Sequence, residues 1–200
     1  MKTDIVLAGV GGQGILSIAN VIGLAALKEN LYLKQAEVHG MSQRGGDVQS
    51  NLRISDTPIA SDLIPFGGAD LIVSLEPMEA LRYLPYLSET GWIVTNTNPF
   101  VNIPNYPEME KVMTELAKVD NLVAFDMDKV AKEIGSPRSS NMVLLGAASP
   151  FLGLPKEIIE EGISGFFASK GEKITDLNLK SFEAGRIEAE KFIKGKAVNV

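Results

Sequence analysis

Residues 5–14 read IVLAGVGGQG, a short β-branched apolar run that breaks into four glycines within six residues. The apolar run is too short for a helix and predicts a strand that is buried on both faces. Apolar residues then recur at helical spacing from Ile15 to Leu27, which predicts a helix directly after the glycines. Residues 9–14 therefore match the G-x-G-x-x-G pattern in a strand–loop–helix context.

The glycine loop has two possible interpretations, a ligand-binding loop and a purely structural turn. Glycines allow a tight turn that presents backbone N–H groups, and a helix N-terminus adds partial positive charge suited to a phosphate or carboxylate. In the ligand-binding interpretation, an anionic or polar ligand group is contacted by Gly11, Gly12, Gln13 and Gly14. The amide side chain of Gln13 is not needed in a simple pyrophosphate cradle. The alternative is a tight turn that binds nothing.

A second polar stretch, residues 37–47, reads EVHGMSQRGGD and follows a predicted strand at 31–38. A loop after a parallel strand lies at the carboxyl edge of the sheet, so we expect this loop beside the glycine loop. Its ligand-binding candidates are Ser42, Gln43, Arg44, Gly45 and Gly46. The catalytic candidates are His39, Gln43 and Arg44, although no general base is identified.

Each charged candidate in this stretch also has a structural alternative. Arg44 is suited to bidentate pairing with a phosphate or carboxylate, but it could equally form an ion pair with Asp47 or Glu37. His39 could be a hydrogen-bonded structural histidine. Arg53 carries the polarity of the stretch into the following strand.

Strand-like and helical patterns alternate along the rest of the chain. Further strands are predicted at 48–54, 69–75, 91–96 and 121–125, and further helices at 76–84, 108–119, 126–135, 141–152, 155–169 and 175–193. This alternation predicts a three-layer α/β/α fold with a largely parallel or mixed sheet, a Rossmann-like first βα unit and a helical last third, in one domain over 1–200.

Polar residues at the ends of two later strands extend the candidate site. Glu76 and Asn96 follow the predicted strands at 69–75 and 91–96, and both are ligand-binding candidates. Asn141, at the start of a predicted helix, is a weaker candidate of the same kind. The alternative for Glu76 is a carboxylate that interacts with the dipole of its own helix.

Composition excludes several classes of function. The chain has no cysteine and one histidine, so it can hold no disulfide, no cysteine-ligated iron–sulfur cluster or zinc, and no His-rich metal site. Its net charge of −6 argues against a general nucleic-acid surface. No apolar run approaches the roughly 20 residues of a membrane span. We therefore expect a cytoplasmic chain that binds neither nucleic acid nor membrane.

Three strings together resemble a known family. GVGGQG at the first turn, EVHGMSQRGGDVQSNLR from residue 37 and LEPMEALRYLPYL from residue 75 are similar to the gamma-type subunit or domain of 2-oxoacid:ferredoxin oxidoreductases. The closest form is the beta subunit of the indolepyruvate enzymes. The resemblance holds at motif level from residue 5 to residue 96, and more loosely through NMVLLGA at 141–147 and the C-terminal helices.

This resemblance implies a reaction and a partner. An arylpyruvate such as indolepyruvate would be oxidatively decarboxylated with coenzyme A, giving an aryl-acetyl-CoA, carbon dioxide and reduced ferredoxin. Thiamine diphosphate, Mg²⁺ and the iron–sulfur clusters would belong to a larger alpha subunit, and ferredoxin would meet the complete enzyme. In agreement, this chain lacks cysteine and a G-D-G string followed by paired asparagines. Its role would be to complete the active site and form part of the coenzyme A side.

Without its partner, such a subunit exposes an apolar interface, so a homodimer of the isolated chain is plausible. Met41, Tyr83, Tyr86 and Trp92 are candidates for that surface, although each is also suited to the core.

Two other functions remain open. One is a stand-alone NAD- or FAD-binding oxidoreductase that uses Gly9, Gly11 and Gly14, with Glu37 placed as the ribose-binding acid. The other is a non-catalytic interaction module that retains the fold.

Overall fold

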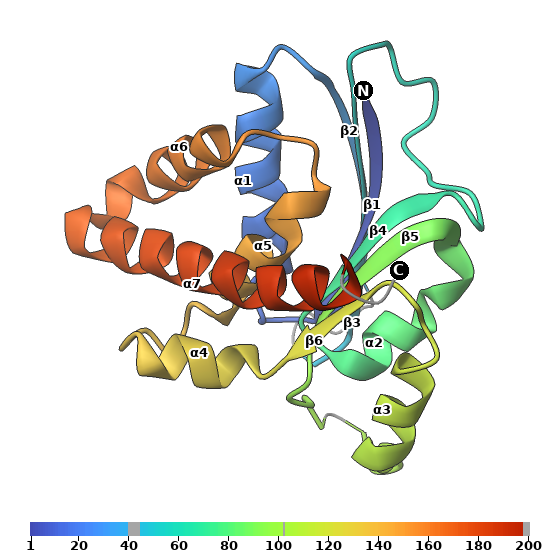
Figure 1. Cartoon of the computed structure of the whole chain (residues 1–200). Coiled ribbons are helices and arrows are strands. Elements are labelled where there is room, and N and C mark those ends of the chain that lie inside the picture. The colour runs from blue at the N-terminus through green and yellow to red at the C-terminus, as the bar shows by residue number, and fades with distance from the viewer. Residues whose placement is uncertain (40–44, 102, 198–200) are drawn as a thin grey trace.

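The computed structural model describes residues 1–39, 45–101 and 103–197. A six-stranded sheet with the order β2-β3-β1-β4-β5-β6 forms its centre (Figure 1). The strands are β1 (Lys2–Val10), β2 (Tyr32–His39), β3 (Asp47–Ser55), β4 (Ala69–Ser74), β5 (Leu87–Asn96) and β6 (Leu122–Phe125). β1, β4, β5 and β6 are mutually parallel, whereas β3 runs antiparallel to both β1 and β2. The sheet is therefore mixed.

Seven α-helices follow or connect the strands in the described part of the chain. They are α1 (Ile15–Lys28), α2 (Pro77–Arg82), α3 (Met109–Leu116), α4 (Met127–Glu133), α5 (Ser140–Ala148), α6 (Lys156–Phe167) and α7 (Glu172–Ala197). The predicted order of strands and helices is confirmed. At the start of α4, the Asp126 carboxylate accepts a hydrogen bond from the backbone N–H of Lys129 and caps the helix. Among the described helices, none combines the length and apolar composition that crossing a bilayer requires.

Helices cover both faces of the sheet. α1 and α5 pack on one face, with α6 against α1 and α7 against α5, while α2 and α3 cover the other face. Alternate residues of the central strands serve the two cores: Ile5 and Leu7 of β1 face α1 and α5, whereas Val6 and Ala8 face α2 and α3. This arrangement confirms the three-layer prediction.

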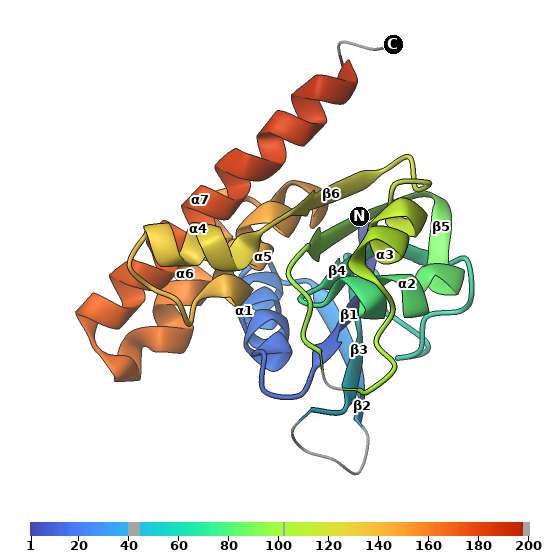
Figure 2. The same cartoon turned by 90° about the horizontal axis from the view of Figure 1, so that it is seen from below.

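Glycines allow α5 and α7 to pack with their backbones in close approach. A Cβ atom added at Gly146 of α5 would lie 1.8 Å from the carbonyl oxygen of Phe182. A Cβ atom added at Gly185 of α7 would lie 1.9 Å from the carbonyl oxygen of Val143. Figure 2 shows α7 crossing α5 and continuing past the body of the domain towards the C-terminus. The two glycines thus fix how α7 is seated.

The position of β2 departs from a dinucleotide-binding fold. In such a fold the second strand lies beside the first, which brings its acidic residue to the glycine loop. Here β3 lies between β1 and β2, and Glu37 is paired with Ser50 of β3. The connection between β2 and β3 is too short for a crossover, so the two strands must form an antiparallel pair. The strand order therefore does not support Glu37 as a ribose-binding residue.

Candidate functional site

The glycine loop and the β2–β3 connection lie side by side, as expected. The N–H of Gly11 donates to the carbonyl of Gly46 at 2.8 Å, and the N–H of Gly45 donates to the carbonyl of Gly11 at 3.3 Å. The backbone of His39 ends β2, but its side chain lies outside the described part of the structure. Ser42, Gln43 and Arg44 also fall outside the described residues, so their predicted roles stay predictions.

Gln13 ties the glycine loop to two strand ends. Its Oε1 accepts a hydrogen bond from the N–H of Val10 at 2.7 Å, and its Nε2 donates to the carbonyl of Leu75 at 3.3 Å. A Cβ atom at Gly9 would come within 3.0 Å of the same Oε1. The amide side chain therefore has a structural reason to be in this loop: it fixes the loop between the carboxyl ends of β1 and β4.

Gly14 joins the glycine loop to α5. It is the N-cap of α1, in the left-handed region at φ 88°, and no side chain caps the helix. Its carbonyl accepts a hydrogen bond from Asn141 Nδ2 at 3.3 Å, and a Cβ atom at this position would lie 2.7 Å from that nitrogen. Both the left-handed conformation and the close approach of Asn141 favour glycine at this position. Within the described residues, no side chain accepts a hydrogen bond from the first N–H groups of α1.

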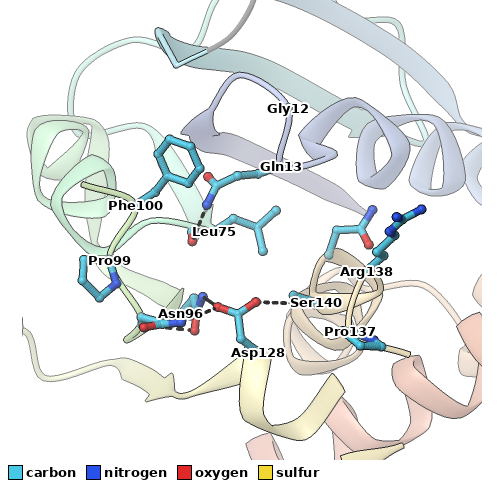
Figure 3. A pocket seen from close by; sticks show the side chains of 12 residues that line it. Gly12, Gln13, Leu75, Asn96, Pro99, Phe100, Asp128, Pro137, Arg138 and Ser140 are labelled. Atoms are coloured by element: carbon cyan, nitrogen blue, oxygen red, sulfur yellow. Dashed lines mark hydrogen bonds between the residues drawn. The ribbon is translucent and has the colours of Figure 1, made fainter. Parts of the chain in front are cut away.

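A cavity of about 420 Å³ opens beside this loop, at the carboxyl edge of the sheet (Figure 3). Its lining comes from the glycine loop, the ends of β4 and β5, α4 and the segment that leads into α5. The lining residues are Gly12, Gln13, Leu75, Asn96, Asn98, Pro99, Phe100, Asp128, Pro137, Arg138, Ser140 and Asn141. The crevice outside the carboxyl ends of the strands is where open α/β sheets bind ligands.

Asp128 organises one wall of the cavity. Its Oδ2 accepts hydrogen bonds from Asn96 Nδ2 at 3.0 Å and from Asn98 Nδ2 at 2.9 Å, while its Oδ1 accepts one from the Ser140 hydroxyl. Burial alone would raise the pKa of Asp128, but these three hydrogen bonds and the charge of Lys132 outweigh it and lower the pKa below its ordinary value. The carboxylate is therefore ionised at neutral pH.

Arg138 supplies the positive charge of the cavity. The side chain is exposed, and within the described part of the chain it forms no ion pair. The acid in the same lining, Asp128, already accepts three hydrogen bonds from neutral donors. Figure 3 shows Arg138 on the α5 side of the cavity and Phe100 on the opposite side. An unpaired guanidinium close to the uncapped N-terminus of α1 favours an anionic ligand group.

Glu76 lies outside the lining of this cavity, and protein groups surround its carboxylate. It is the N-cap of α2, and its Oε2 accepts a hydrogen bond from the N–H of Glu79 at 2.8 Å. Its Oε1 accepts from the hydroxyl of Tyr106 and from the N–H of Phe100. Hydrogen bonds from the protein therefore satisfy this buried carboxylate, and no ligand is needed to explain its burial. Through these contacts Glu76 holds the backbone of Phe100, which lines the cavity, and the side chain of Tyr106.

Among the predicted ligand-binding residues, the structure brings four into the lining: Gly12, Gln13, Asn96 and Asn141. Gly11, Gly14, Gly45 and Gly46 support that wall through backbone contacts. Sequence reasoning missed Asn98, Asp128, Arg138 and Ser140. For Asn98 and Asp128 a signal was present, because they follow the ends of β5 and β6 and so belong to the same edge of the sheet. Arg138 and Ser140 follow a helix rather than a strand, so strand ends give no signal for them.

Several other polar and aromatic candidates lie away from the cavity. Arg53 is paired with Asp4 near the start of β1, at the end of that strand opposite the glycine loop, so it does not extend the site. Tyr83 is a buried core residue rather than an interface residue. Burial, and after it the negative charges of Asp47 and Glu79, raise the pKa of its hydroxyl to about 12. Trp92 stacks on Phe151 with ring centroids 4.5 Å apart.

The remaining interface candidates have separate outcomes. Tyr86 is partly buried, and its ring lies 4.7 Å from that of the exposed Phe66. Met41 lies outside the described residues. In the described part of the chain, no group of three or more His, Cys, Asp and Glu side chains is placed to hold a metal ion.

The fold and the site define an α/β protein that places a polar cavity at the carboxyl edge of a mixed sheet, between a glycine loop and the start of α5. The sequence profile described as pyruvate ferredoxin/flavodoxin oxidoreductase matches residues 4–188. The chain therefore belongs to that family.

Curated relatives match over almost their whole length. The chain is 37% identical over 198 residues to a protein of Archaeoglobus fulgidus named indolepyruvate oxidoreductase subunit IorB, covering 94% of this chain and 96% of that protein. It is 40% identical over 192 residues to a protein of the same name from Pyrococcus horikoshii, covering 91% and 93%. The likeness predicted from the three strings is confirmed.

Solved structures share the fold at lower identity. A keto/oxoacid ferredoxin oxidoreductase gamma subunit from Geobacter sulfurreducens matches with a TM-score of 0.67 and 24% identity, over 94% of this chain and 99% of that chain. A 2-oxoglutarate:ferredoxin oxidoreductase from Magnetococcus marinus, with 2-oxoglutarate, coenzyme A and succinyl-CoA bound, matches with a TM-score of 0.73 and 22% identity. That match covers 95% of this chain but 31% of the other, so the same fold also occurs as part of a longer chain.

Proposed function

We propose that this chain is the subunit without iron–sulfur clusters of a coenzyme A-dependent 2-oxoacid:ferredoxin oxidoreductase acting on indolepyruvate or a related arylpyruvate. The observation that carries the proposal is the cavity at the carboxyl edge of the sheet. There, among the residues that the structure describes, Arg138 has no ion-pair partner and the N-terminus of α1 has no side-chain cap. The substrate class rests on relatives at 37% and 40% identity that are named for indolepyruvate.

The cavity would receive an anionic part of coenzyme A or of the oxoacid. Arg138 would form charge-assisted hydrogen bonds to a phosphate or carboxylate, and backbone N–H groups at the start of α1 would add to them. The apolar side of the cavity, with Leu75, Pro99 and Phe100, suits an uncharged part of the same ligand. Arg44, Gln43 and His39 would complete the cleft from the β2–β3 connection.

The redox chemistry would belong to a partner alpha subunit. This chain has no cysteine with which to hold an iron–sulfur cluster, so the clusters, thiamine diphosphate and Mg²⁺ are assigned to the partner. Ferredoxin would accept electrons from the complete enzyme. In this proposal the isolated chain is inactive, forms a homodimer through surfaces that the partner otherwise covers, and functions in the cytoplasm.

Replacing Arg138 with Gln in the complete enzyme should raise the KM for coenzyme A or for the oxoacid by roughly 10- to 100-fold, the usual worth of hydrogen bonds to a charged group. Steady-state kinetics with each substrate varied in turn would show which one it binds. Lys129→Gln is the matched control, because Lys129 is exposed on α4 outside the cavity lining. If the two variants gave the same KM values as the unmodified enzyme, Arg138 would have no role in binding.

Arg44→Ala tests whether the chain takes part in catalysis at all. In the reconstituted enzyme, this change should lower turnover or raise the coenzyme A requirement by roughly 10-fold, since a bidentate anion contact is lost. The non-catalytic alternative requires an unchanged rate.

Titration of the chain alone with NAD(H) or FAD addresses the dinucleotide alternative, and tight binding accompanied by hydride transfer would contradict the subunit assignment.

A further inference from the structure

Asp128 fixes which way the amide of Asn98 faces. An ionised carboxylate has no proton to donate, so the group that Asn98 presents to it at 2.9 Å must be Nδ2. Asn96 presents its own Nδ2 to the same oxygen at 3.0 Å. Hydrogen bonds and the charge of Lys132 keep the pKa of Asp128 low despite burial, so this arrangement persists at neutral pH. The Oδ1 of Asn98 is thereby directed away from Asp128.

The two asparagines differ in what remains available. The Oδ1 of Asn96 is saturated, because it accepts hydrogen bonds from the N–H groups of Asn98 and Met127 at 3.2 and 3.0 Å. Asn98 is exposed and lines the cavity, and within the described part of the chain its Oδ1 has no hydrogen-bond partner. The cavity therefore offers one oriented side-chain acceptor from Asn98 and one unpaired cation from Arg138.

We infer that Asn98 Oδ1 accepts a hydrogen bond from an amide or amine N–H of the ligand whose anionic part contacts Arg138, and that Asp128 is the positioning residue that holds Asn98 in this orientation. The inference rests on the proposed function, and it adds a chemical requirement: the ligand must carry an N–H donor as well as an anion. Coenzyme A meets it in two places, the adenine amino group and the amides of the pantetheine arm.

Asp128→Asn reverses this orientation without changing the size of the side chain. An amide at position 128 can donate to Asn98, so Asn98 is free to turn and present Nδ2 to the cavity, where it would oppose an N–H donor. The same change removes a negative charge from the lining, which cannot weaken the binding of a simple anion. Ligands with and without an N–H group should therefore respond in opposite ways.

The test is calorimetric titration of the complete enzyme, unmodified and Asp128→Asn, with coenzyme A and with inorganic pyrophosphate. We expect the variant to bind coenzyme A about 5- to 10-fold more weakly, because one neutral hydrogen bond is replaced by two donors that face each other. Its affinity for pyrophosphate should stay the same or increase. Titrations with 3′,5′-ADP and with pantetheine show which N–H donor is bound, the adenine amino group or a pantetheine amide. The fragment that contacts Asn98 should lose affinity for the variant as coenzyme A does.

Two further variants complete the test. Asp126→Asn is the matched control, because Asp126 caps α4 two residues away and does not line the cavity, and it should leave both affinities unchanged. Asn98→Ala removes the acceptor on an exposed loop and should reproduce the selective loss even where Asp128→Asn folds poorly.

Equal losses for coenzyme A and pyrophosphate, or no loss for either, would overturn the inference while leaving the proposed function standing. Failure of the unmodified enzyme to bind coenzyme A would overturn both.

Discussion

The substitutions Gly146→Ala and Gly185→Ala should each lower the free energy of unfolding by about 3 kcal/mol, at the upper end of the usual cost of overpacking. The two glycines lie on facing helices, α5 and α7, at the point where the helix backbones are closest. An added Cβ would meet the carbonyl oxygen of Phe182 at 1.8 Å or that of Val143 at 1.9 Å. Backbone carbonyls cannot rotate away as a flexible side chain can, so the helices themselves must separate.

Separation of these helices has consequences beyond the contact itself. The buried Phe182 packs in the same cluster as Val143, Leu144 and Ala147, so moving α7 opens a void in the larger core. α5 also begins at the cavity, with Ser140 and Asn141 in its lining. We therefore expect a loss of ligand affinity to accompany the loss of stability.

Thermal or urea unfolding measures this prediction. Each kcal/mol lowers Tm by roughly 2–4 °C in a domain of this size, so a decrease of about 6–12 °C is expected. Gly165→Ala is the matched control, because Gly165 lies in α6, is exposed, and an added Cβ would meet nothing within 4 Å. It should stabilise the domain by up to about 1 kcal/mol through helix propensity. Equal effects at the three positions would contradict the close helix approach.

Replacing Arg53 with Met should destabilise the domain by about 3 kcal/mol, because it leaves a buried carboxylate without its main partner. Arg53 and Asp4 lie opposite each other on β3 and β1. Nε donates to Asp4 Oδ1 at 2.7 Å and Nη2 to Oδ2 at 2.9 Å, and Asp4 is only 1% exposed. Nη1 also donates to the carbonyls of Ser61 and Leu63, each at 3.0 Å, which holds the following loop on the sheet.

Acidification gives the same ion pair a second signature. Burial raises the pKa of Asp4, but hydrogen bonds and charge from Arg53 and Lys2 outweigh burial and hold the pKa below its ordinary value of 3.8. A carboxyl whose pKa is lower in the folded state stabilises the fold above its unfolded pKa, and this contribution is lost as the pH falls through the folded value. The stability difference between the unmodified chain and Asp4→Asn should therefore shrink below about pH 4.

Chemical unfolding at neutral and acid pH checks both statements. Lys111→Met is the control, since Lys111 and its partner Glu108 are 74% and 76% exposed and the pair is worth less than about 1 kcal/mol. If Arg53→Met matched this surface variant, Asp4 would have to be stabilised by other groups. If the gap between the unmodified chain and Asp4→Asn widened in acid, the direction assigned to the pKa would be wrong.

Local patterns in the sequence were sufficient to predict the elements. A β-branched run interrupted by glycine made β1 and the turn after it predictable, and apolar spacing did the same for α1, because both signals depend on residues within a few positions of one another. The likeness of EVHGMSQRGG to a family was likewise carried by contiguous residues.

Strand order was not contained in such patterns. The chain could be divided into strands correctly and still suggest that β2 lies next to β1, as the Glu37 interpretation required. The short link between β2 and β3 forces an antiparallel pair. Only the folded sheet shows that β3, not β2, lies beside β1.

The sequence by itself determined the elements, the glycine loop and the absence of cysteine ligands, because these depend on neighbouring residues or on composition alone. Tertiary structure decided the cavity. Gly14 meets Asn141 across 127 positions, and Asp128 joins Asn96 to Ser140 from three different segments. Such contacts arise only when parallel strands bring their carboxyl ends to one edge, so no local signal distinguishes Arg138 at this edge from any other exposed arginine.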